Sequence, residues 1–525
     1  MAIRAALAEQ TAKTKGRTDA DIRRLIADSE LRLASLESKM AELKSAAAPM
    51  EEDGPNDSAL KSVEILLAFS SLLEQRDRER ITADVLRHLV APIRSLPVEL
   101  LAEIFSLTIR DKEKLLSSHL RHFQDAYRVS HICSEWQQIA LCTPQLWTGT
   151  VAVMVGDGEV VTVGDGAVTV GDGEACADGL RAWLARSDPL PVPVVLGGSR
   201  NDEVRDRLPP VLDELLSVAP RWGILHLDGF LPPLFYERLT ACTLDSLETA
   251  YMLPRYCDDI ETTISSLGVP PRLRKLVMNA APPLRILWAQ LTELTLTCGS
   301  AGVSLDILAQ CTSVVTLTLF TDLLDDAGTD ATLPFLRVLK LTFRSETQLS
   351  LFLDFLSAPE LENCSISFIS EISWTQAAFA AFLLRSPNIT HLQLLRCPLT
   401  SNDLIAALVQ ATSLTHLELN GCYRLDDTFL LALRYKVDTP PLVPLLHNFR
   451  FEDTSEILTQ SLFVEMLASR GMTDDGLASP IALPVAQWSH VVLTTPHTVL
   501  FTNDLRDAVQ ELQRRGLPVE IPGGY

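Results

Sequence analysis

The segment LTHLELNGC occupies residues 414–422 and alternates apolar with polar residues at its centre. Leu417 and Leu419 are therefore predicted to share one face of a strand, where side chains repeat with a period of two. The earlier segment ITHLQLLRC, residues 389–397, has the same arrangement. A strand pattern that recurs along the chain in this way indicates a repeating architecture.

Similar strand-like segments recur from about residue 215 to the end of the chain. Amphipathic segments typical of helices, such as QLSLFLDFLSAP and NDLIAALVQAT, lie between them. Successive strand-like segments are about 18 to 32 residues apart, which brackets the 20–29 residues of a leucine-rich repeat. The segments begin at Ile224, Leu244, Leu273, Leu291, Val314, Leu336, Leu361, Ile389, Leu414 and Leu446.

The two clearest units resemble the leucine-rich repeat, whose core reads L-x-x-L-x-L-x-x-N/C. LTHLELNGC matches every position, and ITHLQLLRC matches with isoleucine in first place. Each strand–helix unit leaves apolar faces that only a neighbouring unit can bury, so the units are predicted to stack. The predicted fold class is therefore α/β, a solenoid with parallel strands on its concave side. The alternative is a doubly wound α/β domain, but no glycine-rich phosphate turn follows any strand.

The concave side of such a sheet is the expected place for a partner. Alternating strand residues would point there, but their types identify no ligand, so no substrate-binding residue is assigned. The tail, SHVVLTTPHTVLFTNDLRDAVQELQRRGLPVEI, is predicted to cap the array as a last strand, helix and strand. The polar residues expected on the concave side include Glu293, Thr295, Thr316, Thr318, Lys340, Gln393 and Glu418.

Two helical segments are predicted near the N-terminus. Residues 1–45 contain a helix with a short heptad seam, residues 46–58 are predicted to be a linker, and residues 59–91 form a second helix. Three heptads are short for an autonomous coiled coil, so weak self-association, pairing with a later helix and packing on the rest of the chain all remain open. The seam consists of Ile22, Ile26, Ser29, Leu33, Leu36, Met40 and Leu43.

Three Gly-Asp-Gly triplets lie in residues 150–175, separated by short runs of valine and threonine. Gly-Asp repeats bind Ca²⁺ in β-rolls, but here the spacing is irregular and the double glycine is absent. One Asp per turn also supplies too few of the roughly six to eight oxygens that Ca²⁺ requires. The segment is predicted to be a small β-meander or a low-complexity insertion. Residues 176–214 would connect it to the repeats at 215–525.

The segment SLPVELLAEIFSL, residues 95–107, predicts a helix with more apolar surface than one neighbour can cover. Its apolar residues sweep about 180° of a helical wheel, whereas packing on one core needs only about 100°. Downstream, AYRVSHICSEWQQIA predicts a helix with one apolar face, and TPQLW ends it. These few helices are too small to bury both sides of the first one, so part of its surface should be an interface.

These residues, within 92–149, closely resemble an F-box in the form common among large fungal families of F-box proteins. The family's L-P-x-E-[IL]-[IL]-x-x-[IV]-F is matched by residues 96–105, and its V-S-x-[VI]-C-x-x-W by residues 129–136. The segment LRAWLARSDPLPVPVVL, which begins at Leu180, weakly resembles the link between F-box and repeats in such proteins. The segment IRDKEKLLSSHLRHFQD makes the connection between the two motifs longer than in a compact F-box, and the Gly-Asp-Gly array has no counterpart.

The resemblance implies an adaptor of a Skp–cullin–F-box ubiquitin ligase. In the family, the F-box binds the Skp adaptor protein, which bridges to a cullin, while the repeat domain captures a protein substrate. The alternative is a repeat scaffold or interaction protein that uses its F-box for Skp binding only. The residues expected to contact the Skp protein are Leu96, Pro97, Leu100, Leu101, Ile104, Phe105, Val129, Cys133, Trp136 and Ile139.

The composition argues against several other classes of protein. A net charge of −22 disfavours nucleic acid and anionic membranes as partners, and no apolar run approaches the length of a membrane span. The ten cysteines form no C-x-x-C pair, which favours an intracellular compartment, cytoplasmic and/or nuclear. No catalytic, metal or nucleotide motif is present, so the sequence predicts no enzyme, cofactor or metal. His391 and His416 hold equivalent places in two repeats and are interpreted as a repeat-position preference.

Overall fold

The structure is a computed structural model, and it describes residues 16–47, 57–109, 119–155, 161–163, 173–198, 209–229, 231–253, 270–279, 286–323, 330–343, 346–369, 374–436, 439–452, 459–471, 485–494 and 503–520. The chain divides into two compact units. A helical unit comprises Met1–Arg110 and Val129–Leu141, and a repeat unit comprises Asp111–Arg128 and Cys142–Tyr525. Part of the connection between the two F-box motifs and most of the Gly-Asp-Gly array lie outside the described residues.

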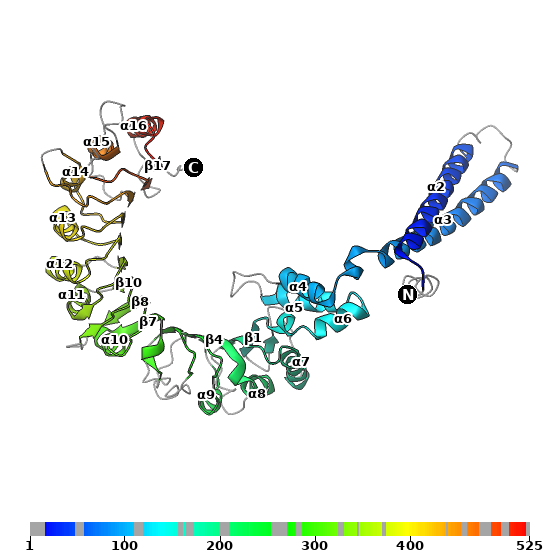
Figure 1. The fold of residues 1–525 in the computed structure, drawn as a ribbon, viewed down its shortest axis with the longest axis horizontal. Helices are drawn as coiled ribbons and strands as arrows, with labels where there is room; N and C mark the ends of the chain where they lie inside the picture. The colour runs from blue at the N-terminus through cyan, green and yellow to red at the C-terminus, as the bar shows by residue number, and fades with distance from the viewer. Residues whose placement is uncertain are drawn as a thin grey trace. The chain divides into compact units, whose positions relative to one another are not determined.

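The helical unit begins with a pair of long antiparallel helices, α2 (Asp19–Ala47) and α3 (Asp57–Leu89) (Figure 1). The heptad seam is the covered side of α2, because its residues are all buried or partly covered, Ile22 and Ser29 among the buried ones. The polar member of the seam is satisfied, since the Ser29 hydroxyl donates to a carboxylate oxygen of Glu79 in α3 at 2.5 Å. The seam therefore pairs with a later helix of the same chain.

In its described residues the repeat unit is built on one sheet of fifteen strands. Its neighbouring strands pair in parallel except for β2, which runs antiparallel to β1. The strands are β1 (Val151–Val155), β2 (Val161–Val163), β3 (Val192–Gly198), β4 (Trp222–Gly229), β5 (Thr249–Leu253), β6 (Lys275–Asn279), β7 (Glu293–Ser300), β8 (Thr316–Leu323), β10 (Val338–Phe343), β12 (Asn363–Phe368), β13 (His391–Leu395), β14 (His416–Asn420), β15 (Asn448–Glu452), β16 (His490–Thr494) and β17 (Val519–Glu520). A separate small sheet pairs β9 (Ala331–Thr332) with β11 (Leu356–Ser357).

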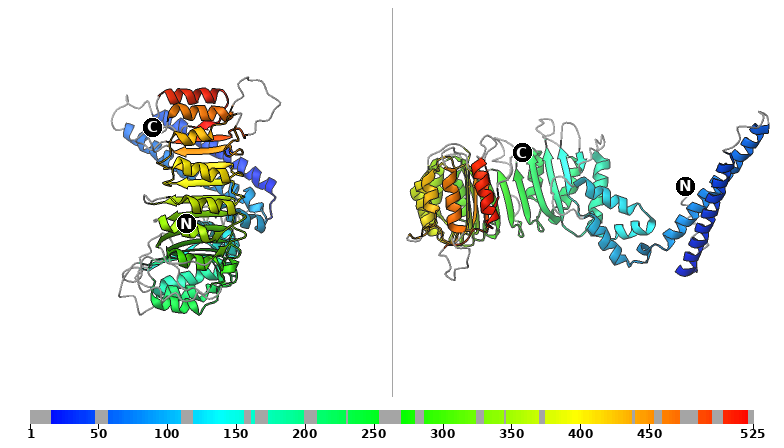
Figure 2. Two further views of the ribbon diagram at one scale, coloured as in Figure 1. Left: turned by 90° about the vertical axis from the view of Figure 1, so that its left-hand side faces the viewer. Right: turned by 90° about the horizontal axis from the view of Figure 1, so that it is seen from above.

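The helices of the repeat unit lie along one face of the curved sheet, and from α11 to α16 they pack on one another in chain order (Figures 1 and 2). They are α7 (Gly173–Arg186), α8 (Pro210–Ser217), α9 (Pro233–Thr240), α10 (Ala301–Leu308), α11 (Glu346–Phe355), α12 (Gln376–Arg385), α13 (Ser401–Gln410), α14 (Asp427–Leu433), α15 (Gln460–Gly471) and α16 (Asn503–Arg514). The spatial order of the sheet's strands follows the chain from β3 to β17. A doubly wound sheet reverses its order at a switch point, so the fold is solenoid-like and that alternative is wrong.

The ten strand-like segments found in the sequence coincide with or overlap ten strands between β4 and β15. The weakest match is the segment at Leu244, which overlaps β5 only at its end because Leu244 and Leu247 enter the core before the strand begins. The sheet also begins before residue 215, because β1 lies in the segment assigned to an insertion and β3 in the connecting segment. These two strands are rich in valine, so leucine spacing does not mark them.

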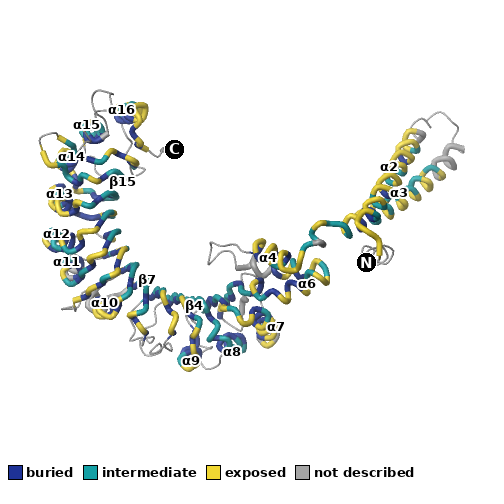
Figure 3. Tube along the Cα trace, in the orientation of Figure 1, coloured by how far each residue is buried: buried dark blue, intermediate teal, exposed yellow. Residues whose placement is uncertain are grey.

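The leucines of the repeat core hold neighbouring units together. Leu414, Leu417 and Leu419 are at most 2% exposed, and Leu417 pairs in register with Leu392 on one side and Phe449 on the other. Figure 3 shows the buried residues concentrated where the sheet meets its helices. Full burial of one leucine contributes about 1.5–3 kcal/mol, and here that burial exists only when the adjacent unit is in place.

The cysteines at the last position of the two clearest repeats bind the preceding strand. The Cys422 thiol donates to the carbonyl oxygen of Leu394 at 3.6 Å, and the Cys397 thiol donates to that of Ile366 at 3.5 Å. Burial raises the pKa of Cys422 to about 12, which keeps its thiol protonated as a donor at neutral pH. In these two repeats the N/C position of the motif thus fastens the unit to the one before it.

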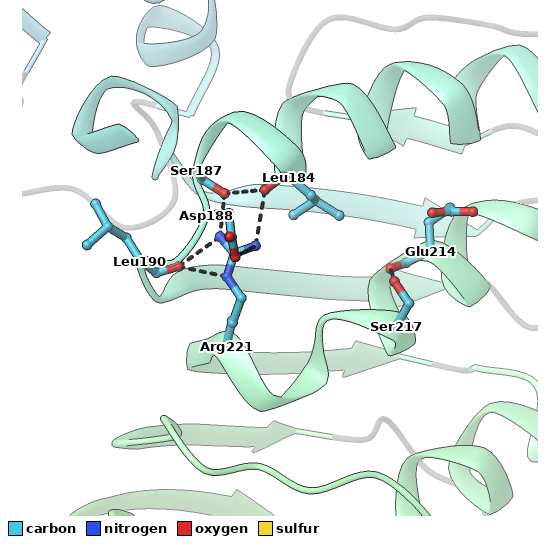
Figure 4. Close-up of polar contacts among 7 residues, drawn as sticks. All are labelled: Leu184, Ser187, Asp188, Leu190, Glu214, Ser217 and Arg221. Atoms are coloured by element: carbon cyan, nitrogen blue, oxygen red, sulfur yellow. Dashed lines mark hydrogen bonds and ion pairs between the residues drawn. The ribbon is translucent and has the colours of Figure 1, made fainter. Parts of the chain in front are cut away.

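Arg221, the residue directly before β4, binds the turn between the end of α7 and β3 (Figure 4). Its guanidinium donates to the carbonyl oxygens of Leu184 at 3.1 Å and Leu190 at 2.9 Å, and to the Ser187 hydroxyl at 2.7 Å. The carboxylate of Asp188 lies 3.3 Å from the same guanidinium. These contacts fix the turn in ARSDPL, within the segment that resembles the link of fungal F-box proteins.

Arg470 of α15 serves the same purpose in the C-terminal repeats, where it is fully buried. Its guanidinium donates to the carbonyl oxygens of Leu433 at 3.1 Å and Val443 at 3.2 Å, and also to that of Leu442. The ring centre of Trp488 lies 5.5 Å from the guanidinium carbon. Burial lowers the pKa of Arg470 to about 10, so the group is still charged at neutral pH. It supplies donors that the end of α14 and the following loop lack.

Replacing Arg470 by methionine should destabilise the C-terminal repeats, because two buried carbonyl oxygens and one partly buried one would lose their donor. An unsatisfied buried polar group costs about 1–3 kcal/mol, so we expect the local free energy of opening to fall by about 2–5 kcal/mol. Native-state hydrogen exchange of α14 and α15 measures this quantity. The matched control is Arg515→Met, whose side chain is 55% exposed and should change stability by less than about 0.5 kcal/mol. Equal effects of the two substitutions would contradict this role.

Candidate protein-docking site

The helix predicted from SLPVELLAEIFSL is α4 (Val98–Ile109), and one of its two apolar faces is covered within its own unit. Leu101 and Phe105 on this inner face are 1% and 2% exposed. They face α6 (Ser134–Leu141), where the ring of Trp136 lies 4.7 Å from that of Phe105, centre to centre, with the planes at 51°. The inner face of α4 is therefore core.

The other apolar face of α4 remains in water. Leu100, Ile104 and Leu107 are 52%, 37% and 58% exposed, and their spacing of three and four places them on one side of the helix. They lie opposite the buried residues on the helical wheel. This outer face is the apolar surplus that the sequence predicts, and no residue of the described helical unit buries it.

The second motif forms two helices and not the single helix expected from AYRVSHICSEWQQIA. The helix α5 (His119–Ser130) ends before the motif's cysteine, and α6 begins directly after it. The Cys133 sulfur accepts a hydrogen bond from the Trp136 backbone N–H at 3.5 Å, and the Cys133 carbonyl accepts from Gln137 at 2.9 Å. Cys133 therefore stands at the N-cap of α6, a role that apolar spacing alone does not indicate.

The ten residues predicted to contact a partner differ in their exposure. The buried residues lie beneath the surface, and only the exposed and partly covered residues are available to a docking protein. Exposed are Pro97, Leu100 and Ile104; partly covered are Leu96, Val129, Cys133 and Trp136; buried are Leu101, Phe105 and Ile139.

Several exposed apolar residues of the same unit are missing from that prediction. Val98 and Leu107 belong to the apolar sweep of α4, so the helical wheel alone is enough to predict them as contact residues. Ile132 lies in the bend before α6. The single helix predicted from the sequence places this residue on the apolar face, so its exposure is not expected. The four omitted residues are Val98, Leu107, Ile132 and Leu141, which are 56%, 58%, 58% and 41% exposed.

The polar residues expected on the concave side of the sheet do lie together on one face. Thr295, Thr318 and Lys340 are consecutive partners in the register of β7, β8 and β10, and Gln393 is opposite Glu418. The remaining two candidates, Glu293 and Thr316, pair with each other in the register of β7 and β8. A cavity of about 500 Å³ opens on this face above β10 and β12 to β16.

The described residues give no sign of a metal site, since none of their histidine, cysteine and carboxylate side chains come together in groups of three or more suited to an ion. None of the helices in the described part of the chain combines the length and the apolar character that a membrane crossing requires.

Comparison with known proteins identifies the helical motif independently. Residues 93–150 match the family model described as F-box-like. No curated protein matches the chain. The chain thus contains an F-box-like domain, and its long parallel sheet with helices on one face is consistent with a leucine-rich-repeat-like domain after it.

The two faces of α4 should respond differently to truncation. Phe105→Ala removes a buried ring and should lower the local free energy of opening of α4 and α6 by about 3–5 kcal/mol. Leu107→Ala, the matched change on the outer face, should lower it by less than about 0.5 kcal/mol. Native-state hydrogen exchange of the full chain measures both. If the outer change were as costly as the inner one, the outer face would be core and not a free surface.

Proposed function

We propose that this chain is the substrate-recognition adaptor of a Skp–cullin–F-box ubiquitin ligase. Its F-box-like domain would dock on the Skp adaptor protein through the outer face of α4, and its repeat unit would hold a protein substrate. The single observation that carries the proposal is the row Leu100, Ile104 and Leu107, left exposed on a domain that matches the F-box-like family. Apolar side chains gathered in this way favour coverage by a partner.

An adaptor of this kind performs no chemistry of its own. F-box proteins are generally adaptors, and their contribution is to raise the effective concentration of a target lysine near activated ubiquitin bound through the cullin. The eight cysteines that the structure describes as free suit a reducing intracellular compartment, the cytoplasm or the nucleus. Weak self-association through the N-terminal hairpin is part of the proposal, since Leu31 and Leu66 there are 70% and 67% exposed.

The test of Skp docking is Leu107→Asp in the full chain. Docking would bury Leu107, and losing the burial of one leucine costs about 1.5–3 kcal/mol. The dissociation constant for the Skp adaptor protein should therefore rise by about tenfold to a hundredfold. Isothermal titration calorimetry measures this constant, and circular dichroism checks the fold. The matched control is Leu384→Asp on α12, where the native side chain is 63% exposed and no Skp contact is proposed.

Three outcomes separate the candidate functions. Loss of affinity in Leu107→Asp alone, together with recovery of a cullin with the wild-type chain, supports the ligase adaptor. Skp binding without a cullin favours the alternative, a scaffold that uses the F-box for Skp binding only. If the wild-type chain does not bind the Skp protein, both proposals fail.

A further inference from the structure

The cavity on the concave face is lined by two parallel rows of polar side chains. Register places the residues of each row side by side, one from each strand, with spacings of about 4.8 Å. One row contains Lys340, Ser365, Gln393, Glu418 and Arg450. The second row contains Asn363, His391, His416, Asn448 and His490.

Hydrogen-bond donors converge above β12. Lys340 lies on β10 at one side of this strand, and Gln393 and His391 lie on β13 at the other. The Ser365 hydroxyl donates to the Gln393 side-chain oxygen at 2.7 Å, which leaves the NH₂ group of Gln393 available to a ligand. The amide of Asn363 adds a further donor between the two flanks. We call these five residues the β12 patch.

The charge of this patch is positive and is not neutralised within the patch. The partners of Lys340 in register are Thr318 and Ser365, both neutral, and Lys340 is exposed. Elsewhere in the cavity Arg450 already faces Glu418 at 3.9 Å, and beside the cavity Arg337 faces Glu362 at 3.4 Å. Lys340 therefore stands as an exposed cation without a carboxylate opposite it, on a chain of net charge −22.

A stacked pair of histidines borders the patch. The rings of His391 and His416 are 3.8 Å apart, centre to centre, and nearly parallel at 16°. The Thr415 hydroxyl donates to a backbone carbonyl at 3.0 Å, so its oxygen accepts from Nδ1 of His416, 2.8 Å away. The Asn448 amide then donates to Nε2 of His416 at 2.5 Å. This network favours a neutral His416, because a proton on Nε2 would meet the amide donor.

His391 differs from its neighbour at one atom. Its Nδ1 lies 2.8 Å from the Thr390 hydroxyl oxygen, as the equivalent atom of His416 does from Thr415. Its Nε2, however, makes no hydrogen bond with any residue that the structure describes. A ligand with an acceptor oxygen could therefore meet a protonated Nε2 of His391 without breaking an existing contact.

From these contacts we propose that the β12 patch binds a carboxylate of an extended acidic segment of the protein substrate, held between Lys340 and His391. This inference rests on the proposed function, because it names the kind of substrate that the repeat unit takes. The amides of Asn363 and Gln393 orient the carboxylate, and Lys340 supplies the charge. The cavity extends across about five inter-strand spacings, from β10 to β16. That distance accommodates about seven residues of an extended peptide.

Binding should strengthen as the pH falls. Burial lowers the pKa of His391 below 6.5, His447 lowers it further, and Glu362 acts in the opposite direction. Burial, His391 and His447 lower the pKa of His416. A carboxylate beside Nε2 stabilises the protonated form of His391, so the bound complex takes up a proton that the free protein lacks near pH 7.

The test uses fluorescein-labelled octapeptides with alternating serine and glutamate, and matched peptides with glutamine in place of glutamate. Fluorescence anisotropy with the full chain should show the glutamate peptide binding at least tenfold tighter. Lys340→Gln should remove most of that preference. The matched control Lys39→Gln removes the same charge from an exposed position on α2 and should change affinity by less than about twofold.

A pH series separates the role of His391. Affinity for the glutamate peptide should rise at least threefold from pH 7.5 to pH 6.0, and His391→Gln should abolish that rise. Equal binding of the glutamate and glutamine peptides, or an unchanged preference in Lys340→Gln, overturns the inference. Binding only by a phosphoserine version of the peptide overturns it as well. Skp affinity is measured on the same preparations, so failure of the peptide preference with intact Skp binding rejects this inference and leaves the adaptor role standing.

Discussion

Burial of the strand leucines against the next unit is the interaction on which the repeat domain depends. Leu417 is covered because Leu392 and Phe449 occupy the same register on its two sides, and each of those residues depends on its own neighbours in turn. The thiols of Cys397 and Cys422 add a polar link in the same direction along the array. This arrangement leaves the alternate side chains of every strand on the opposite face, where a row of polar residues becomes available for recognition.

The F-box-like domain buries only part of its apolar surface. Its inner face is covered, since Phe105 packs on Trp136 and Leu101 is buried, but in the part of the domain that the structure describes the outer face of α4 stays exposed. The outer row of Leu100, Ile104 and Leu107 is thus exposed, and it is the surface that we propose for the Skp adaptor protein. The helix α4 therefore has one apolar face that is packed inside the domain and a second apolar face that is exposed.

Much of this architecture could be predicted from apolar spacing. Period-two leucines locate the strands from β4 to β15, and the wide apolar sweep of residues 95–107 indicates an interface. Spacing does not reveal which side is buried, because Leu100 and Leu101 are adjacent and chemically identical while their exposures are 52% and 1%. That difference comes from the position of α6, which depends on contacts distant in the sequence.

Other features depend on single hydrogen bonds that no periodicity encodes. The break before α6 rests on the Cys133 cap, and the valine-rich strands β1 and β3 join the sheet through backbone pairing. The apolar spacing of the sequence says nothing about Arg221 and Arg470, which in the structure satisfy carbonyl oxygens at the ends of α7 and α14. The two rows of polar side chains on the concave face likewise depend on the strand register, which the sequence does not give.

The most direct test of the account is hydrogen exchange of the full chain with and without the Skp adaptor protein. The account predicts slower exchange in α4 and α6 on binding, with exchange in α11 to α14 unchanged. Unaltered exchange in α4 under conditions where the Skp protein is bound, or protection confined to the repeat unit, would contradict it.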